Sequence, residues 1–168
     1  MARDHARIKT ARWKDGDWRA LPWEAQWLYD TLISQPDLTR AGVLDYRPGR
    51  LAALASGLTG RKVDNAAKSL EAARFVVIDR QTEELLVRSH VRHDGVLDRV
   101  NMGKAVGRAL DKVVSLDVRQ AILAELARYY GDKPGLAGWA GLGELFPDDM
   151  DAIRAMSSTI PLPIASGK

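Results

Sequence analysis

The residues of this 168-residue chain that are best suited to chemistry are polar and basic side chains that could contact nucleic acid. Arg61, Asn65 and Lys68 stand four and three residues apart, so a helix would place them on one face. Such side chains bind base edges and phosphates when a helix enters the major groove of DNA. An ordinary solvated helix face carries similar residues, so the neighbouring elements must decide between the two interpretations.

Two further basic groups could contact the phosphate backbone. One lies in a positively charged N-terminal segment, and the other repeats at a four-residue interval in a later helical stretch. Phosphate contacts position a protein on DNA without specifying a sequence. The complete set of predicted DNA-binding residues is Arg61, Lys62, Asn65, Lys68, Ser69, Arg7, Lys9, Arg12, Lys104 and Arg108.

Catalytic and metal-binding patterns are sparse. The chain has no cysteine and three histidines, and His90 and His93 have no third ligand at a suitable spacing. The glycines at Gly57 and Gly60 do not have the spacing of a phosphate-binding loop. No serine or carboxylate pair stands in a recognisable catalytic pattern. The sequence therefore predicts a protein that is not an enzyme and needs no metal or cofactor.

Composition favours a cytoplasmic location in a bacterial host cell. The absence of cysteine suits a reducing compartment, and no apolar stretch has the length of a signal peptide core or a membrane span. We therefore expect no membrane partner. The net charge of +3 and the sequence pI near 9.3 permit nucleic-acid binding without requiring it.

Residues 61–73 form the clearest predicted helix. Thr59 can cap its start, and Gly57 can end the preceding helix in the left-handed conformation. That preceding helix can begin at Pro48, with Leu51, Leu54 and Ala55 on its apolar side. The apolar face of the later helix consists of Val63, Ala66, Ala67, Leu70 and Ala73. These patterns predict a helix, a turn and a second helix.

Strand-like runs flank this helix pair. Residues 42–46 predict a short strand, and residues 75–79 and 85–90 predict a hairpin. With a further helix after Pro22, the order matches a winged helix-turn-helix in which the hairpin is the wing. Glu83 and Glu84 at the expected wing tip would repel phosphate, so the helix is expected to contact DNA more than the wing does.

The predicted fold is mostly α with a small β-hairpin, an α+β winged helix-turn-helix followed by additional C-terminal helices. We expect a basic arm at 1–21, held by Trp13 and Trp18 while its cations stay in solvent. The DNA-binding domain should span 22–95, and a helical extension for packing or dimerisation should span 96–130. Residues 116–130 of this extension form a broad apolar stripe, which must be covered by the winged domain or by a second subunit. The Gly/Pro-rich acidic segment at 131–168 should be mostly loop, with one helix at 148–156 and a flexible tail at 161–168.

Several motifs also carry a family resemblance. They are Ala-Arg-Ile-Lys-Thr at 6–10 with Trp13, the run at 21–29, Gly42-Val43-Leu44, and the hairpin exit at 87–97. The chain resembles phage and prophage winged helix-turn-helix proteins of actinobacterial type with replication-initiation or replisome-organiser roles. The resemblance implies DNA binding in replication or its regulation, with Arg61, Asn65 and Lys68 facing the groove and no catalytic residue. Residues 98–102 depart from the family, which has a Pro-Asn pair there, and no helicase-loader module follows.

The expected partner is therefore double-stranded DNA, and the chain could also form a homodimer or bind a replication or host protein. An alternative function is a protein-interaction module that uses the same fold without DNA. Trp23 and Trp27 lie four apart at the edge of the helix that follows Pro22, where they could pack within the chain or contact a partner.

Overall fold

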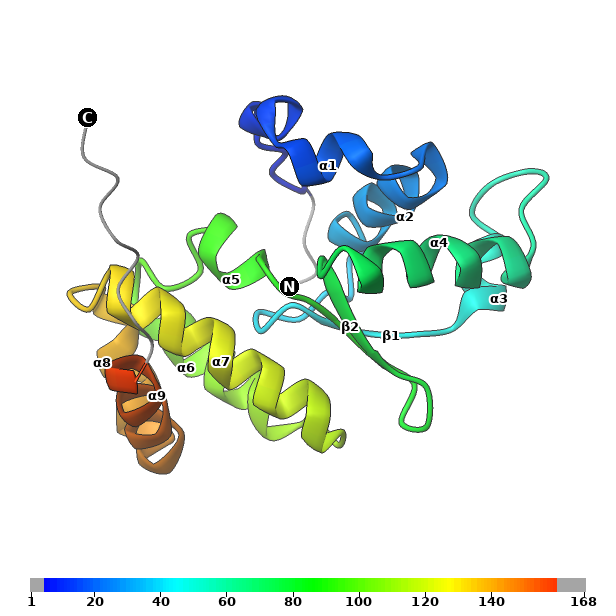
Figure 1. Ribbon diagram of the computed structural model, residues 1–168. Coiled ribbons are helices and arrows are strands. Elements are labelled where there is room, and N and C mark those ends of the chain that lie inside the picture. The colour runs from blue at the N-terminus through cyan, green and yellow to red at the C-terminus, as the bar shows by residue number, and fades with distance from the viewer. Residues whose placement is uncertain (1–4, 160–168) are drawn as a thin grey trace.

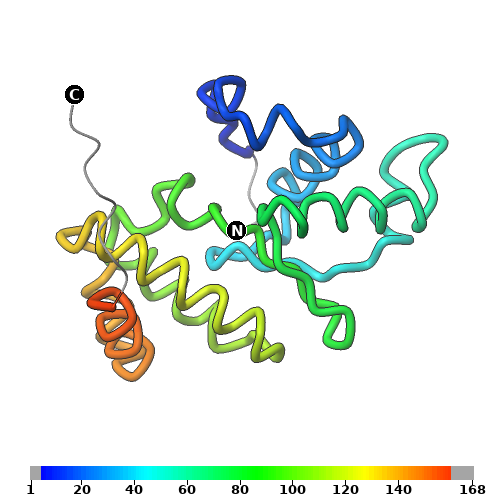
Figure 2. Tube along the Cα trace, viewed as in Figure 1, coloured from blue at the N-terminus to red at the C-terminus, as the bar shows by residue number. Residues whose placement is uncertain are grey.

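The computed structural model describes residues 5–159, in which helices surround a small three-stranded antiparallel sheet (Figures 1 and 2). This arrangement confirms the predicted mostly helical α+β class. The strands are β1 Val43–Asp45, β2 Val76–Asp79 and β3 Glu84–Val87. The helices are η1 Thr10–Lys14, α1 Gly16–Ala20, α2 Trp23–Ile33, α3 Pro48–Ala52, α4 Gly60–Ala72, α5 His90–His93, α6 Val100–Asp111, α7 Leu116–Asp132, α8 Ala137–Leu145 and α9 Pro147–Thr159.

The sheet has the strand order β1-β3-β2, so β3 lies in the middle. Leu85 of β3 stands opposite Leu44 on one side and Ile78 on the other. Gly42 leads into β1 with a φ of 84°, and its carbonyl accepts a hydrogen bond of 2.8 Å from the amide of Val87. A Cβ at Gly42 would lie 2.9 Å from the Val87 carbonyl oxygen, so glycine allows this close approach.

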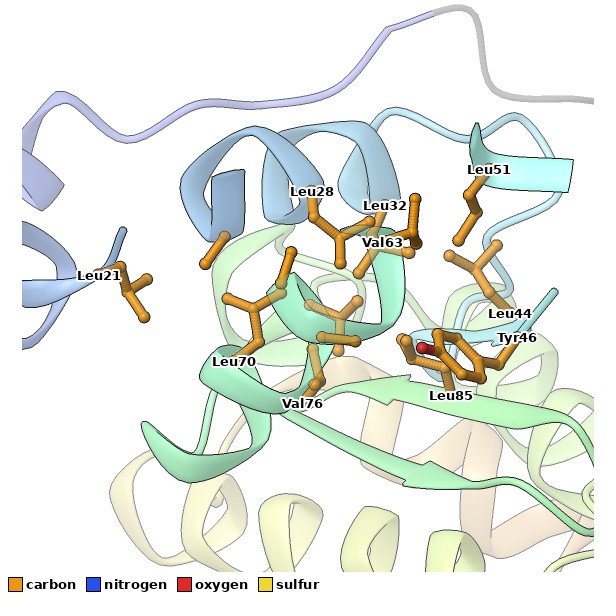
Figure 3. Packing of buried hydrophobic residues seen from close by; sticks show 14 of the residues in the cluster. Leu21, Leu28, Leu32, Leu44, Tyr46, Leu51, Val63, Leu70, Val76 and Leu85 are labelled. Atoms are coloured by element: carbon orange, nitrogen blue, oxygen red, sulfur yellow. The ribbon is translucent and has the colours of Figure 1, made fainter. Parts of the chain in front are cut away.

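Helices α2, α3 and α4 cover one face of the sheet (Figure 3). Leu28 and Leu32 of α2 and Leu70 of α4 are almost completely buried against Leu44 and Leu85 of the sheet. Their spacing places them on one side of each helix. The apolar face predicted for α4 is confirmed, although Ala73 after α4 is only partly buried. Tyr29 and Ile33 of α2 are also only partly buried.

Helix α3 is shorter than the sequence predicted. It ends at Ala52, once Leu51 and Ala52 are buried, and Leu54 keeps 54% of its surface exposed. The chain then continues through turns that extend outward at the edge of the molecule (Figure 2). Gly57 has the expected positive φ of 78°, and Thr59 caps α4 by accepting the amide of Lys62.

The opposite face of the sheet packs against helices α6 to α9. Side chains alternate along a strand, so Leu85 belongs to the first core while its neighbour Leu86 belongs to the second. Helix α7 lies against the sheet, α9 packs on α7, and α8 packs on α6. The apolar stripe predicted at 116–130 is therefore covered within the chain, except at Leu116, which keeps 74% of its surface exposed.

The C-terminal glycines hold α6 and α8 close together. A Cβ at Gly103 of α6 would lie 1.7 Å from the carbonyl oxygen of Gly138 in α8. One at Gly141 would lie 2.0 Å from the carbonyl oxygen of Val100. The prediction that residues 131–147 are mostly loop is thus wrong, because α8 uses its small residues for close helix packing. The helix predicted at 148–156 is confirmed as part of α9, and the tail predicted at 161–168 lies outside the described residues.

The N-terminal segment folds against α2 and the start of β2. Trp18 is 2% exposed and makes edge-to-face contacts with Tyr29 and Phe75, as expected for an arm held by its indoles. Trp13 contacts Trp18 edge-on but keeps 56% of its surface exposed. Of the two tryptophans at the edge of α2, Trp27 packs within the chain against the first core, whereas Trp23 at the first turn does not and is 69% exposed.

Candidate nucleic-acid interface

The outer face of α4 is polar and open to solvent. The inner face is fixed by Val63, Ala66, Ala67 and Leu70, which are all buried in the first core. Arg61, Lys62, Asn65 and Lys68 are consequently exposed, and Ser69 is half-buried at their edge. Five of the ten predicted DNA-binding residues therefore share one helix, as the sequence pattern indicated.

The side chains on this face differ in how firmly they are held. Arg61 and Asn65 make no side-chain hydrogen bond or ion pair with another residue of the described range 5–159. The ammonium of Lys62 donates to the carbonyl of Gly57 at 2.9 Å, and Lys68 pairs with Asp64 at 3.0 Å. The hydroxyl of Ser69 turns back to the carbonyl of Asn65 at 3.4 Å. Arg61 and Asn65 are thus the most available groups.

Asp64 connects α4 to the hairpin and to the segment after β1. Its carboxylate accepts a hydrogen bond from the hydroxyl of Tyr46 at 2.8 Å and pairs with Arg80 at 3.3 Å, besides Lys68. Hydrogen bonds from Lys68 and then Tyr46 lower the pKa of Asp64. Burial, followed by the hydrogen bond to Asp64, raises the pKa of Tyr46. Asp64 is therefore an ionised structural link.

Arg80 neutralises the acidic residues of α4. Its guanidinium pairs with Glu71 at 2.8 Å as well as with Asp64, and the hydrogen bond to Glu71 contributes most to raising its pKa. It also lies 5.6 Å from the ring centroid of Tyr46. Sequence patterns do not reveal this role of Arg80, because its partners lie sixteen and nine residues away along the chain.

The two glutamates near the hairpin tip, Glu83 and Glu84, both make contacts within the molecule. Glu84 accepts the backbone amides of Val114 and Ser115 at 2.9 and 2.6 Å, at the start of α7. A carboxylate is favourable there because the first amides of a helix lack intrahelical partners. Glu83 has a positive φ of 56°, and its carboxylate lies 3.4 Å from Arg47. Glu84 therefore supports the helical layer, whereas Glu83 remains at the tip.

The predicted arm cations are not on the α4 face. Arg12 pairs with Asp30 at 2.5 Å and stacks over the ring of Trp18 with 4.5 Å to its centroid. Only 16% of its side chain is exposed, so the expectation that it stays in solvent is wrong. Burying the indole of Trp18 brings the guanidinium of Arg12 against α2. Arg7 and Lys9 are exposed and line a groove near α5.

The predicted cations of α6 form a third, separate group. Lys104 pairs with Glu144 of α8 at 2.7 Å, which ties it to the second core. Arg108 is exposed on the same helix. The buried residues of α6 belong to the core on the other side of the sheet from α4 (Figure 1). The structure therefore does not gather the ten predicted residues into one surface.

Comparisons of the chain with protein-family profiles, with curated proteins and with solved structures find no match. Within residues 5–159, no group of three or more histidine and carboxylate side chains could hold a metal ion. None of the helices in that range has both the length and the apolar character needed to cross a membrane.

Proposed function

We propose that the protein binds double-stranded DNA as a winged helix-turn-helix protein, with α4 as the recognition helix. The observation that carries the proposal is the order α2, β1, α3, α4, β2, β3 together with the strand order β1-β3-β2. This connectivity leaves one long helix of the domain with an open polar face. A fold alone does not define a function, so the side chains of α4 must support the assignment.

The charges of α4 favour contact with a polyanion. Asp64 and Glu71 are the acidic residues of the helix, and Arg80 pairs with both. Arg61 and Lys62 thus contribute positive charge at the exposed first turn without an ion pair to any residue from 5 to 159. We assign Arg61 and Asn65 to base edges and Lys62 and Lys68 to phosphates. The resemblance to phage and prophage proteins supports a role in replication initiation or transcriptional regulation.

Selection of bound duplexes from a random pool tests this function. The wild-type protein should enrich a sequence motif, and the variant carrying Arg61→Ala, Asn65→Ala and Lys68→Ala should lose it. A matched variant carrying Arg99→Ala, Asn101→Ala and Lys112→Ala removes the same residue types from exposed sites at the other helical layer. This control should keep the motif. Enrichment that survives in the α4 variant would refute the assignment.

Salt dependence then counts the phosphate contacts. With Lys62 and Lys68 at phosphates, the slope of log affinity against log salt should be roughly −2, at about −0.9 per phosphate. Lys68→Ala should reduce the slope by about one contact and weaken all sequences alike. A slope near zero would exclude an electrostatic interface on α4.

A protein-interaction module remains the second candidate function, and the exposure of Trp23 favours it. Tryptophan is enriched among residues that anchor protein interfaces, and this indole is not covered by the domain. If this function holds, acrylamide quenching of the tryptophan fluorescence should fall on adding the partner and not on adding duplex DNA. Trp23→Ala should abolish that protection. Strong duplex binding that survives Trp23→Ala but not the α4 substitutions would favour the DNA-binding proposal.

A further inference from the structure

A second basic surface lies away from the outer face of α4, in a groove of about 600 Å³. The N-terminal segment forms one wall, and the chain around α5 together with α7 forms the others. Seven lysine and arginine residues line the groove against four acidic residues. The cations are Arg7, Lys9, Arg12, Arg74, Arg88, Arg92 and Arg128.

Ion pairs within the protein neutralise only some of these cations. Arg88 and Arg128 share Glu125, at 2.7 and 2.9 Å, and Arg12 pairs with Asp30 as described above. Arg92 pairs with Asp132 at 3.2 Å between two half-exposed side chains. The remaining three, Arg7, Lys9 and Arg74, make no side-chain ion pair with any residue in the described part of the chain.

Two of these three cations, Arg7 and Lys9, come from the N-terminal wall of the groove, and Arg74 comes from the turn after α4. Arg7 reaches the chain after α5, where its guanidinium lies 3.6 Å from the position that a Cβ on Gly95 would occupy. Lys9 and His93 line the same groove, where partial desolvation and then the charges of Lys9 and Arg92 lower the pKa of the imidazole. Arg74 follows α4 with a φ of 62°, and its carbonyl accepts a hydrogen bond from Arg88. The groove therefore brings together positive charge from two segments that lie far apart in the sequence.

We propose that this groove binds phosphate groups, carried either by a free nucleotide or by a nucleic-acid strand. Arginine-rich sites recognise phosphate because the planar guanidinium offers several donors in a fixed arrangement. The groove has the volume of an ordinary small-molecule site and is open enough to admit a chain. This site goes beyond the α4 interface and does not depend on it.

The test combines calorimetry with the NMR titration of His93. The probes are ATP without magnesium and a single-stranded oligothymidylate of twenty nucleotides. A bound phosphate should raise the pKa of His93, since a negative charge nearby favours the protonated imidazole. Lys9→Gln combined with Arg74→Gln should weaken binding at least about tenfold, as expected for two charge-assisted contacts. The matched control is Lys14→Gln with Arg99→Gln, which removes one lysine and one arginine from exposed sites outside the groove.

Each outcome decides the proposal or its source of phosphate. If ATP binds and oligothymidylate cannot displace it, the groove is a nucleotide site. If the oligonucleotide binds and ATP does not, the groove is a site for a nucleic-acid strand. Mutual displacement identifies a site for either. If neither probe changes the pKa of His93, or if both double variants lose affinity equally, the groove is not a phosphate site. The α4 triple variant should retain groove binding, so failure of the duplex-binding proposal would be seen separately.

Discussion

The helical layers on the two faces of the sheet differ in how they use charge and close packing. On one face, α2 to α4 bury a core of large side chains and leave the outer side of α4 polar and exposed. On the other face, α6 and α8 approach through glycines, and pairs such as Lys104 with Glu144 and Arg119 with Asp149 tie its helices together. The first layer thus presents polar side chains that a ligand could contact, while the second layer has charged side chains that join its helices to one another.

This contrast separates residues that build the scaffold from residues that can bind a ligand. Lys104 and Arg119 of the second layer pair with carboxylates of neighbouring helices. In contrast, Arg61 and Asn65 of the first layer have no side-chain partner among residues 5–159. Substitutions should therefore change stability in one layer and affinity in the other.

Gly103→Ala should be the most damaging single change to the second layer. Its Cβ would lie 1.7 Å from a backbone oxygen of α8, so the two helices must separate. We expect a loss of about 3 kcal/mol in the free energy of unfolding, despite the higher helix propensity of alanine. Urea unfolding followed by circular dichroism measures this loss.

Gly49→Ala is the matched control for that experiment. It lies in helix α3, and nothing lies within 4 Å of its added Cβ. Its stability should stay the same or rise by up to about 1 kcal/mol, because the backbone of the unfolded chain becomes less free. If both variants had equal stability, the close contact between α6 and α8 would not hold the layer together.

Leu85→Ala and Leu86→Ala test whether the two layers unfold together. The two residues are neighbours on β3, each at most 1% exposed, but they point into different cores. Each substitution should cost about 3 kcal/mol. Native-state hydrogen exchange should show protection falling in both α4 and α7 for either variant. A loss confined to α7 in Leu86→Ala would show instead that the layers open independently.

Asp64→Asn should have a smaller effect that depends on pH. The substitution removes the charge that Lys68 and Arg80 share, at a cost of about 1 kcal/mol at neutral pH after solvent screening. The pKa of Asp64 is lowered in the folded protein, so its stabilisation is present above the unfolded pKa and disappears as pH falls through the folded pKa. The difference between wild type and variant should therefore shrink below about pH 4. A difference that persists at pH 2 would contradict this account.

Arg61→Ala should change stability least, by less than about 0.5 kcal/mol, because the side chain is exposed and unpaired within the described range. Under the proposed function, it should nevertheless weaken duplex binding by about 1 to 3 kcal/mol. Lys104→Gln provides the reverse pattern, with a small loss of stability from the broken pair with Glu144 and unchanged duplex affinity. Thermal unfolding and fluorescence anisotropy with labelled duplex measure both quantities.

Local patterns predicted much of the first layer. The apolar spacing of Val63, Ala66, Ala67 and Leu70 identified α4, and Thr59 marked its start by capping chemistry that operates within three residues. The same local logic failed for α8, because a glycine-rich helix is stable only against a partner such as Gly103, which the sequence does not place. It also failed for Arg80 and Arg12, whose carboxylate partners become neighbours only when the chain has folded.

Because both faces of the sheet are buried by helices, one face stays uncovered while the later part of the chain is being synthesised. Residues up to β3 can complete the first core, but Val43 and Leu86 gain their covering only from helices made later. An apolar strand face would remain open during that interval, and such faces promote association between chains. Truncation after residue 95 should consequently yield a product that aggregates, whereas the full chain protects the sheet as soon as α7 reaches it.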